Sequence, residues 1–411
     1  MTGSASLETR VCVVGGGPAG IVLGYLLARA GNAVTILEKH GDFLRDFRGD
    51  TVHPSTMTVL DELGLLGEFL QRPHSEIVRL DGHIGSDTIT IADFSRIPAK
   101  TKFLAIMPQW DFLSFLAEKG RAYAGFSLLM NAGATGVIRR NGRIAGVCAT
   151  GPDGEMEIRA DVVVACDGRS STLRSVAGMV PRDLGAPMDV LWMRLSKRPS
   201  DRNAALGFIG AGAFLILIDR NDYWQCGFVI AKGSAETVRA RGLEAFRAEI
   251  SATAPVVADR VDEIKSWDDV KLLTVTVDRL ERWFLPGLLF IGDAAHAMSP
   301  IGGVGINLAI QDAVATANIL SAALQRPGPI GDQVLAAVQR RRTYPTVMTQ
   351  GLQVLIGRQA VTRVLRAKSP PKHAPLALRV LTAIPGFRRI PAYLVGIGFR
   401  PENVSKLVRD S

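Results

Sequence analysis

An apolar run, a glycine-rich turn and two further apolar stretches follow one another near the start of the chain. The run before Gly15 is rich in β-branched residues, as in a buried strand. The Ala- and Leu-rich stretch that starts at Pro18 and ends at Gly31 is typical of a helix. Residues 33–37 have the length of another strand. This order predicts a strand–helix–strand unit, from which parallel sheets are built.

Two later apolar runs end in turns that carry an aspartate. Residues 161–166 lead to Asp167, and residues 288–291 lead to Gly292 and Asp293. Ligands of open parallel sheets bind beyond the carboxyl ends of the strands. We therefore expect these two turns and the first glycine turn to line one crevice.

A second sheet is predicted from β-rich runs at residues 189–197, 204–220 and 223–231. Within the first run, Trp192 and Arg194 share a face because side chains alternate along a strand. Gln225 can project in the same direction. These three residues are the candidate substrate contacts, with core packing and solvent exposure as the competing interpretations.

Composition indicates an ordinary soluble globular protein of two joined domains, because the 411 residues are 47% hydrophobic and 21% charged. The four cysteines have no C-x-x-C spacing, so we expect neither a disulfide framework nor a metal site. A reducing cytoplasm fits this cysteine usage best.

Basic charge is concentrated in the tail. From Arg340 onward there are 14 Lys and Arg against two acidic residues, a net of +12, so the rest of the chain sums to −3. This distribution argues against a catalytic body that binds nucleic acid. The tail either packs on the folded body, which we favour, or lies on an anionic membrane surface.

The first glycine turn has the spacing of a dinucleotide site. Gly15, Gly17 and Gly20 fit G-x-G-x-x-G, in which the glycines permit a tight turn, approach to a pyrophosphate and close helix packing. Glu38 ends the next strand, where its carboxylate can accept both ribose hydroxyls, and Lys39 follows it. A glycine turn without a ligand is the alternative, but it does not require Glu38.

Together these motifs resemble the flavoprotein aromatic hydroxylases of the p-hydroxybenzoate hydroxylase type, the class A flavin monooxygenases. The family pattern GDAAHxxxPxxGxGxN is matched over residues 292–307, and DGxxSxxR is matched over residues 167–174. The resemblance spans roughly residues 8–325. It implies that the first glycine turn holds the ADP half of FAD and that the later motif holds the ribityl and flavin half.

The resemblance also implies roles for single residues. Asp293 bonds the ribityl chain, and the helix that begins near Gly303 to Gly305 points its N-terminus at the flavin. The candidate cofactor-binding residues are Gly15, Gly17, Gly20, Glu38, Lys39, Arg48, Gln109, Asp167, Asp293, Gly303, Gly305, Ile306 and Asn307. Arg48, Pro300 and Gly302 are the candidate catalytic residues. Surface exposure is the alternative for Arg48 and Gln109, and we expect structural roles for His53 and His296.

The implied architecture is α/β, with a Rossmann-like FAD-binding domain, an inserted β-sheet substrate domain and a C-terminal helical segment. The FAD-binding domain comprises residues 1–71, 101–180 and 281–335. The substrate domain comprises residues 72–100 and 181–280, and the basic helical segment residues 336–411. A monomer and a homodimer both remain open.

The implied activity is a monooxygenase reaction with non-covalent FAD. NADPH or NADH reduces the flavin, which captures dioxygen as a C4a-hydroperoxide and hydroxylates an aromatic or polyketide-like molecule. One alternative is a related FAD-dependent oxidoreductase that reduces or desaturates an isoprenoid, or a halogenase, although the halogenase signature W-x-W-x-I-P is missing. Another is a FAD-binding protein without turnover. The substrate, the choice between NADPH and NADH and the role of the tail remain open.

Overall fold

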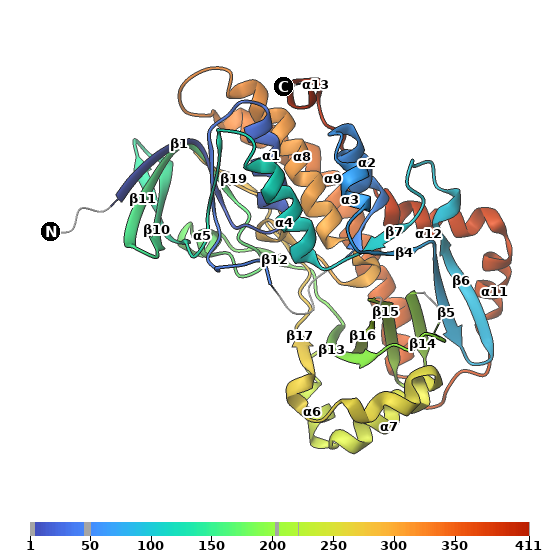
Figure 1. The fold of residues 1–411 in the computed structure, drawn as a ribbon. Coiled ribbons are helices and arrows are strands. Elements are labelled where there is room, and N and C mark those ends of the chain that lie inside the picture. Colours follow the sequence, from blue (N-terminus) through green and yellow to red (C-terminus); the bar gives the residue numbers. More distant parts are fainter. Residues whose placement is uncertain (1–4, 45–50, 202–204, 221, 411) are drawn as a thin grey trace.

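A sheet built around parallel strands carries the glycine turn and both later motifs (Figure 1). The computed structural model describes residues 5–44, 51–201, 205–220 and 222–410. Strands β8, β2, β1, β11 and β20 lie side by side in this order and run parallel. Strands β9 and β10 extend β11 in antiparallel fashion, and β19 pairs with β20. The strands are β1 (Ala5–Val14), β2 (Val34–Leu37), β8 (Phe126–Leu129), β9 (Gly133–Arg140), β10 (Arg143–Gly151), β11 (Gly154–Ala165), β19 (Phe284–Leu285) and β20 (Leu288–Phe290).

The predicted strands of this sheet are confirmed, and one of them is longer than expected. The apolar pattern predicts a strand from residue 161, but β11 begins at Gly154. Its first half is more polar, yet it pairs with β10 on one side and with β1 from Ala5 onward on the other. Ladder hydrogen bonds on both sides stabilise an extended conformation that the hydrophobic pattern alone does not reveal.

Helices cover the sheet and bury α1 almost completely. Helix α1 contacts both α4 and α8, so ten of its twelve residues are buried although a helix on a protein surface would be amphipathic. This packing explains the uniformly apolar sequence that follows Pro18. The helices of this half are α1 (Pro18–Arg29), α2 (Pro54–Glu62), α3 (Leu66–Leu70), α4 (Gln109–Gly120), α5 (Thr172–Val176) and α8 (Gly305–Ala323).

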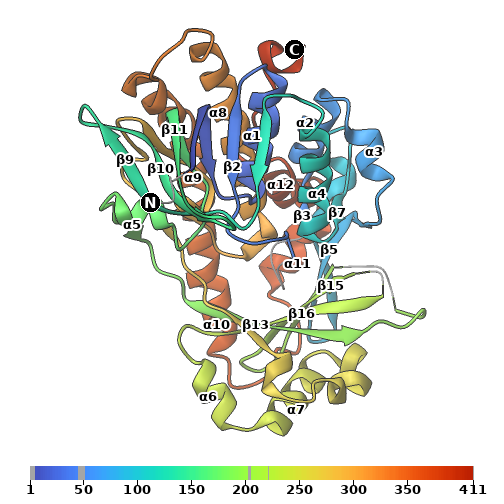
Figure 2. The same cartoon turned by 60° about the vertical axis from the view of Figure 1, so that its left-hand side comes forward.

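The second predicted sheet is also present, in the strand order β17-β13-β16-β15-β14-β5-β6. It joins chain segments that lie far apart in the sequence, because β14 pairs in parallel with β5. Figure 2 shows this sheet below the first, with α6 and α7 beneath it. Its strands are β5 (Arg79–Ile84), β6 (Asp87–Asp93), β13 (Met188–Ser196), β14 (Ala205–Ile209), β15 (Phe214–Asp219), β16 (Tyr223–Ala231) and β17 (Lys271–Leu273).

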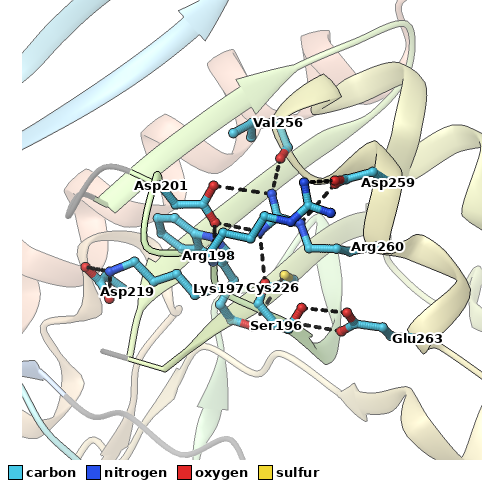
Figure 3. Close-up of polar contacts among 11 residues, drawn as sticks. Ser196, Lys197, Arg198, Asp201, Asp219, Cys226, Val256, Asp259, Arg260 and Glu263 are labelled. Atoms are coloured by element: carbon cyan, nitrogen blue, oxygen red, sulfur yellow. Dashed lines mark hydrogen bonds and ion pairs between the residues drawn. The ribbon is translucent and has the colours of Figure 1, made fainter.

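One face of the second sheet packs on α6 (Ala235–Ala240), α7 (Leu243–Thr253) and a 3-10 helix (Pro255–Glu263). At the edge of this layer, hydrogen bonds and ion pairs between polar side chains connect it to the loop after β13 (Figure 3). Arg260 is buried and donates to Asp201 at 2.5 Å, and the indole N–H of Trp224 donates to the same carboxylate at 3.0 Å. The guanidinium thereby ties the 3-10 helix to the loop that follows β13.

Two small sheets lie in the connections between the halves. One contains β3 (Thr51–Val52), β7 (Leu104–Ile106) and β4 (Ser75–Ile77), and the other contains β12 (Arg182–Asp183), β18 (Asp278–Arg279) and β21 (His296–Ala297). Short 3-10 helices span Phe94–Arg96, Trp267–Asp269, Gly292–Ala294 and Ile301–Gly303.

The predicted helical tail is confirmed, and it returns to both halves of the molecule. Helix α9 packs on α8, α11 and α12 contact β6, and α13 contacts α1 and α8. Within the described residues, the structure contains no helix with enough length and apolar character to cross a bilayer. The tail elements are α9 (Asp332–Ile356), a π-helix (Gly357–Val361), α10 (Thr362–Leu365), α11 (Leu376–Ala383), α12 (Pro385–Gly396) and α13 (Lys406–Arg409).

Candidate active site

Four turns meet at one edge of the first sheet. Gly15 follows β1, Glu38 follows β2, Asp167 lies just beyond β11, and Asp293 lies just beyond β20. Because these strands are parallel neighbours, their carboxyl ends share an edge. The structure therefore brings together residues that are up to 278 positions apart in the sequence.

The glycine loop has the geometry that its spacing predicts. Gly15 has a φ of +107°, and a Cβ on this residue would lie 2.4 Å from the carbonyl oxygen of Cys166. A Cβ on Gly20 would lie 1.9 Å from the carbonyl oxygen of Gly15. At Gly17, by contrast, a Cβ would meet no atom within 4 Å. Gly15 and Gly20 are thus required by the protein's own packing, whereas Gly17 leaves room for a ligand at the N-terminus of α1.

Glu38 is buried and faces the glycine loop. One carboxylate oxygen accepts the backbone N–H of Gly16 at 2.9 Å, and the other accepts the N–H of His40 at 3.0 Å. A carboxylate oxygen can accept more than one hydrogen bond, so ribose hydroxyls can share this carboxylate. The neighbouring Lys39 is exposed to solvent.

Asp167 and Arg174 connect the two later motifs. Asp167 accepts the N–H of Leu173 at 3.1 Å through Oδ2, while its Oδ1 is buried without a hydrogen-bond partner. Burial raises the pKa of Asp167 above its ordinary value. Arg174 is buried and donates to the carbonyl oxygen of Ala294 at 3.1 Å, which holds the two motifs together.

Asp293 pairs with a cation that our sequence interpretation missed. Arg169 Nε lies 3.0 Å from Asp293 Oδ2, and both side chains are partly exposed, at 36% and 30%. The available signal was the position of Arg169 two residues after Asp167 in the same turn. The pair lies at the sheet edge where the resemblance places the ribityl chain.

The loop before α8 exposes backbone to solvent. Gly302 and Gly303 are exposed and have φ values of +77° and +64°, which other residues rarely adopt. Pro300 and Ile306 are half-buried on either side of them. Helix α8 begins at Gly305 without a side-chain cap, so its first N–H groups are available to an electron-rich ligand.

Buried hydrogen bonds hold this loop in place. His53 is fully buried, with Nε2 3.0 Å from the carbonyl oxygen of Gly303 and Nδ1 2.7 Å from that of Val395. Asn307 is also buried, and its Oδ1 accepts the hydroxyl of Ser55 at 2.8 Å. The predicted structural role of His53 therefore has a geometric basis: it connects the loop before α8 to the end of α12.

A buried ionic network lies behind the GDAAH turn. Asp312 accepts the N–H of Gly292 at 3.0 Å, contacts His296 Nε2 at 2.6 Å and pairs with Arg342 at 2.8 Å. Arg342 also pairs with Glu402 at 3.2 Å. Burial favours the neutral acid, but His296 and Arg342 outweigh it and lower the pKa of Asp312. No local sequence signal identifies Arg342, because its partners lie 30 and 60 residues away.

Trp192 lies on the face of the second sheet that is turned away from α7. It pairs with Gly227 across β13 and β16, and a Cβ on Gly227 would lie 2.9 Å from the indole ring. Trp192 belongs to an apolar cluster that includes Val361 of the tail and is bordered by Ile301. The structure thus places this candidate substrate residue near the loop before α8.

The other two candidate substrate residues have protein partners. Arg194 is exposed and stacks over the ring of Tyr223 at 3.8 Å. Gln225 is buried and accepts Arg220 Nε at 2.9 Å. Both lie on the same sheet face as Trp192, since Arg194 and Gln225 are directly paired in the ladder.

Two further candidates flank the site region. Gln109 is the first residue of α4, is half-buried and has hydrogen-bonding or ionic partners. Arg48 lies outside the described residues. No group of acidic, histidine or cysteine side chains within the described ranges is arranged to hold a metal ion.

The residues at this edge fit FAD. The space at Gly17 suits a pyrophosphate, the unpartnered Oδ1 of Asp167 suits a hydroxyl donor, and the uncapped start of α8 suits an electron-rich ring. The fold and the site therefore define a FAD-dependent oxidoreductase.

Comparison with known proteins narrows this class. The chain belongs to the FAD binding domain family, whose model matches residues 8–348. It is 36% identical over 388 residues to 6-methylpretetramide 4-monooxygenase of Streptomyces rimosus, covering 93% of this chain and 91% of that relative. Rifampicin monooxygenase of Streptomyces venezuelae is 28% identical and covers 74% of this chain and 62% of its own length. The chain is a FAD-dependent monooxygenase, as predicted.

Solved structures share the fold. The structure of PqsL from Pseudomonas aeruginosa with 2-aminobenzoylacetate has a TM-score of 0.74 at 23% identity, covering 87% of this chain and 97% of the other. p-Nitrophenol 4-monooxygenase of Pseudomonas putida has a TM-score of 0.72 at 18% identity, covering 99% and 96%. The predicted α/β fold class is confirmed by these likenesses.

Proposed function

We propose that this monooxygenase hydroxylates a polycyclic aromatic polyketide, using NADPH or NADH and dioxygen. The observation that carries the proposal is the 36% identity to 6-methylpretetramide 4-monooxygenase over nearly the whole length of both chains. Another relative, 27% identical over 74% of this chain, is the 12-dehydrotetracycline 5-monooxygenase/anhydrotetracycline 6-monooxygenase of Streptomyces rimosus. We place the enzyme in the cytoplasm, as a monomer or homodimer.

In this proposal, the chain's own residues divide the binding of FAD between the two motifs. The N-terminus of α1 receives the pyrophosphate and Glu38 receives the adenosine ribose. Asp293 bonds the ribityl chain, and Arg169 holds that carboxylate at the sheet edge. FAD, when bound, supplies electron transfer from the nicotinamide and activation of dioxygen.

Helix α8 and the loop before it provide the electrostatic environment of the reaction. The first turn of α8 has no side-chain cap, and its N–H groups carry partial positive charge that stabilises negative charge on a neighbouring ring system. Pro300 and Gly302 border the place where oxygen is transferred. Trp192 and the apolar side chains around it position an aromatic substrate and exclude water.

Anaerobic reduction followed by admission of oxygen tests this function. The purified FAD-bound protein is mixed with NADPH, and in parallel with NADH, with and without a panel of polycyclic phenols that includes 6-methylpretetramide. We expect a panel member to accelerate flavin reduction and to gain one oxygen atom derived from labelled dioxygen. Reduction without oxygen incorporation would indicate a reductase or desaturase, and a flavin that neither nucleotide reduces would indicate a binding protein without turnover.

A further inference from the structure

Exposed apolar side chains are concentrated in the C-terminal tail. Of the 20 large apolar side chains that are exposed in the described part of the chain, 12 lie after residue 336, although this segment is less than a fifth of the protein. Single exposed apolar residues are ordinary, but a concentration of them marks a surface that meets an apolar partner. Half of the 12 lie on or beside α11 and α12.

Helix α11 has two different faces. Leu378 packs beside Ile84 and Ile89 of the β5–β6 hairpin. Leu376, Val380 and Ile384, the last at the C-cap, are spaced by four residues and are 73%, 55% and 52% exposed. A shift of two residues turns a helix by about 200°, so this row lies opposite Leu378. The helix is held to the body by one face and presents an aliphatic row on the other.

Helix α12 extends the same kind of surface. Ala392 is fully buried in a cluster with Phe94. Ile390, two positions earlier, is 54% exposed, and Arg389 beside it is also exposed. Both helices contact β6 and lie toward the margin of the molecule in Figure 1. We call the exposed residues Lys372, Leu376, Val380, Ile384, Arg389 and Ile390 the tail surface.

The charge of the tail is as uneven as its hydrophobicity. Between Arg340 and Pro401 the sequence contains no Asp or Glu. Lys372 and Arg389 are exposed and flank the aliphatic row in the sequence, four residues before Leu376 and five after Ile384. The acidic residue that approaches α11 comes from β6, where Asp87 lies 3.7 Å from Arg379. A partner of the tail surface must therefore combine apolar contact with negative charge.

We propose that the tail surface binds the interface of an anionic phospholipid membrane. Aliphatic side chains flanked by cations suit the boundary between headgroups and acyl chains. A second copy of the chain fits less well, because a twofold interface would place the same cations against each other. A protein partner also fits less well, since protein interfaces favour aromatic anchors and this row is aliphatic.

Docking in this way orients the enzyme. Because α11 and α12 contact β6, the lipid surface lies beside the seven-stranded sheet. Apolar ring systems partition into that interface, so the protein is held where such compounds concentrate. The association is electrostatically assisted and weakens as salt screens the cations.

Vesicle cosedimentation of the full-length, FAD-bound protein tests the proposal. Vesicles of phosphatidylcholine alone are compared with vesicles that also contain phosphatidylglycerol, at low and at high salt. One variant combines Leu376→Ser, Val380→Ser and Ile384→Ser, and a second combines Lys372→Glu and Arg389→Glu. The matched control is Arg139→Glu with Arg140→Glu, which makes the same charge change on exposed residues of β9. All variants are first checked for unchanged melting temperature and FAD content.

We expect binding to phosphatidylglycerol vesicles that falls with salt and that each tail-surface variant weakens by about tenfold or more, while the control variant binds normally. Equal loss in the control variant, or no binding by the unaltered protein, would overturn the proposal. Light scattering provides the remaining outcome. If the unaltered protein is a dimer that does not bind vesicles, and the triple serine variant is a monomer, the surface would be assigned to a second copy of the chain instead.

Discussion

Arg342 provides the sharpest test of how the tail supports the FAD site. Its guanidinium is 1% exposed and lies between two buried carboxylates, Asp312 at 2.8 Å and Glu402 at 3.2 Å. Arg342→Met keeps an apolar stem of similar length but removes the charge. Asp312 would then keep His296 and the N–H of Gly292 as partners, and Glu402 would keep Arg341.

The loss of stability expected for Arg342→Met follows from the burial of Asp312 and Glu402. Removing one member of a buried ion pair costs about 3–5 kcal/mol, because the remaining charge stays desolvated. Both carboxylates retain other partners, so we expect a loss near the lower end, about 3 kcal/mol. The same substitution removes the hydrogen bond from Arg342 to Asp312 Oδ1 and leaves the carboxylate, which holds the GDAAH turn through the N–H of Gly292, less firmly positioned. FAD affinity should therefore fall together with stability.

Arg260→Met is the matched control. Arg260 is 4% exposed and pairs with a buried Asp201 at 2.5 Å, but it belongs to the outer layer of the second sheet (Figure 3). Its loss should cost comparable stability without weakening FAD binding. The assays are denaturant unfolding and titration of the apoprotein with FAD. If Arg342→Met binds FAD as tightly as Arg260→Met does, or unfolds at the same denaturant concentration as the unaltered protein, the network does not support the site.

Further predictions concern the cofactor, the glycine loop and acid stability. Acid precipitation should release FAD into the supernatant, and colour that stays in the pellet would show covalent attachment. Asp293→Ala should raise the Kd for FAD, since it removes a charge-assisted hydrogen bond of about 1.5–3 kcal/mol; an unchanged titration curve would place the ribityl chain elsewhere. Gly20→Ala should prevent the protein from folding and binding FAD, because the added Cβ would lie 1.9 Å from a carbonyl oxygen. Gly31→Ala is the control: its Cβ would meet no atom within 4 Å, so the variant should retain FAD despite some backbone strain. Circular dichroism and FAD content compare the two variants. Because the pKa of Asp312 is lowered, its charge contributes fully to stability above the ordinary value of 3.8, and this contribution is lost as pH falls below that value. Asp312→Asn should therefore lose less free energy of unfolding than the unaltered protein as pH is lowered. Identical curves of unfolding free energy against pH would refute this.

Local sequence patterns predicted the parts of the site that are determined by neighbouring residues. Gly15 and Gly20 pack as their spacing implies, and Glu38 faces the loop as expected at the end of the second strand. These features depend on contacts within one strand–helix–strand unit. The roles of Glu38 and of Asp293 toward the cofactor remain predictions, and Arg48 lies outside the described residues.

Contacts between distant segments were not predictable in the same way. Trp192 was predicted to share a face with Arg194, but only the pairing of β13 with β16 shows that its ring covers Gly227. Arg169 was overlooked because its partner, Asp293, lies 124 residues further along the chain. A single sequence contains periodicity and spacing, but it does not state which side chains meet across a sheet edge.

The sequence by itself determined the class of fold and a dinucleotide site, because periodic apolar runs, glycines at obligatory turns and an acid after a strand are local consequences of backbone geometry. FAD as the cofactor came from the resemblance of the three motifs to a known family. The tertiary structure decided which side chains of the tail are buried and which are exposed. Arg342 and Glu402 complete a buried network behind Asp312, while Leu376 and Val380 stay exposed on α11. Both outcomes depend on which surfaces are already covered by other segments. Burial and desolvation are properties of the whole folded chain, and no local pattern encodes them.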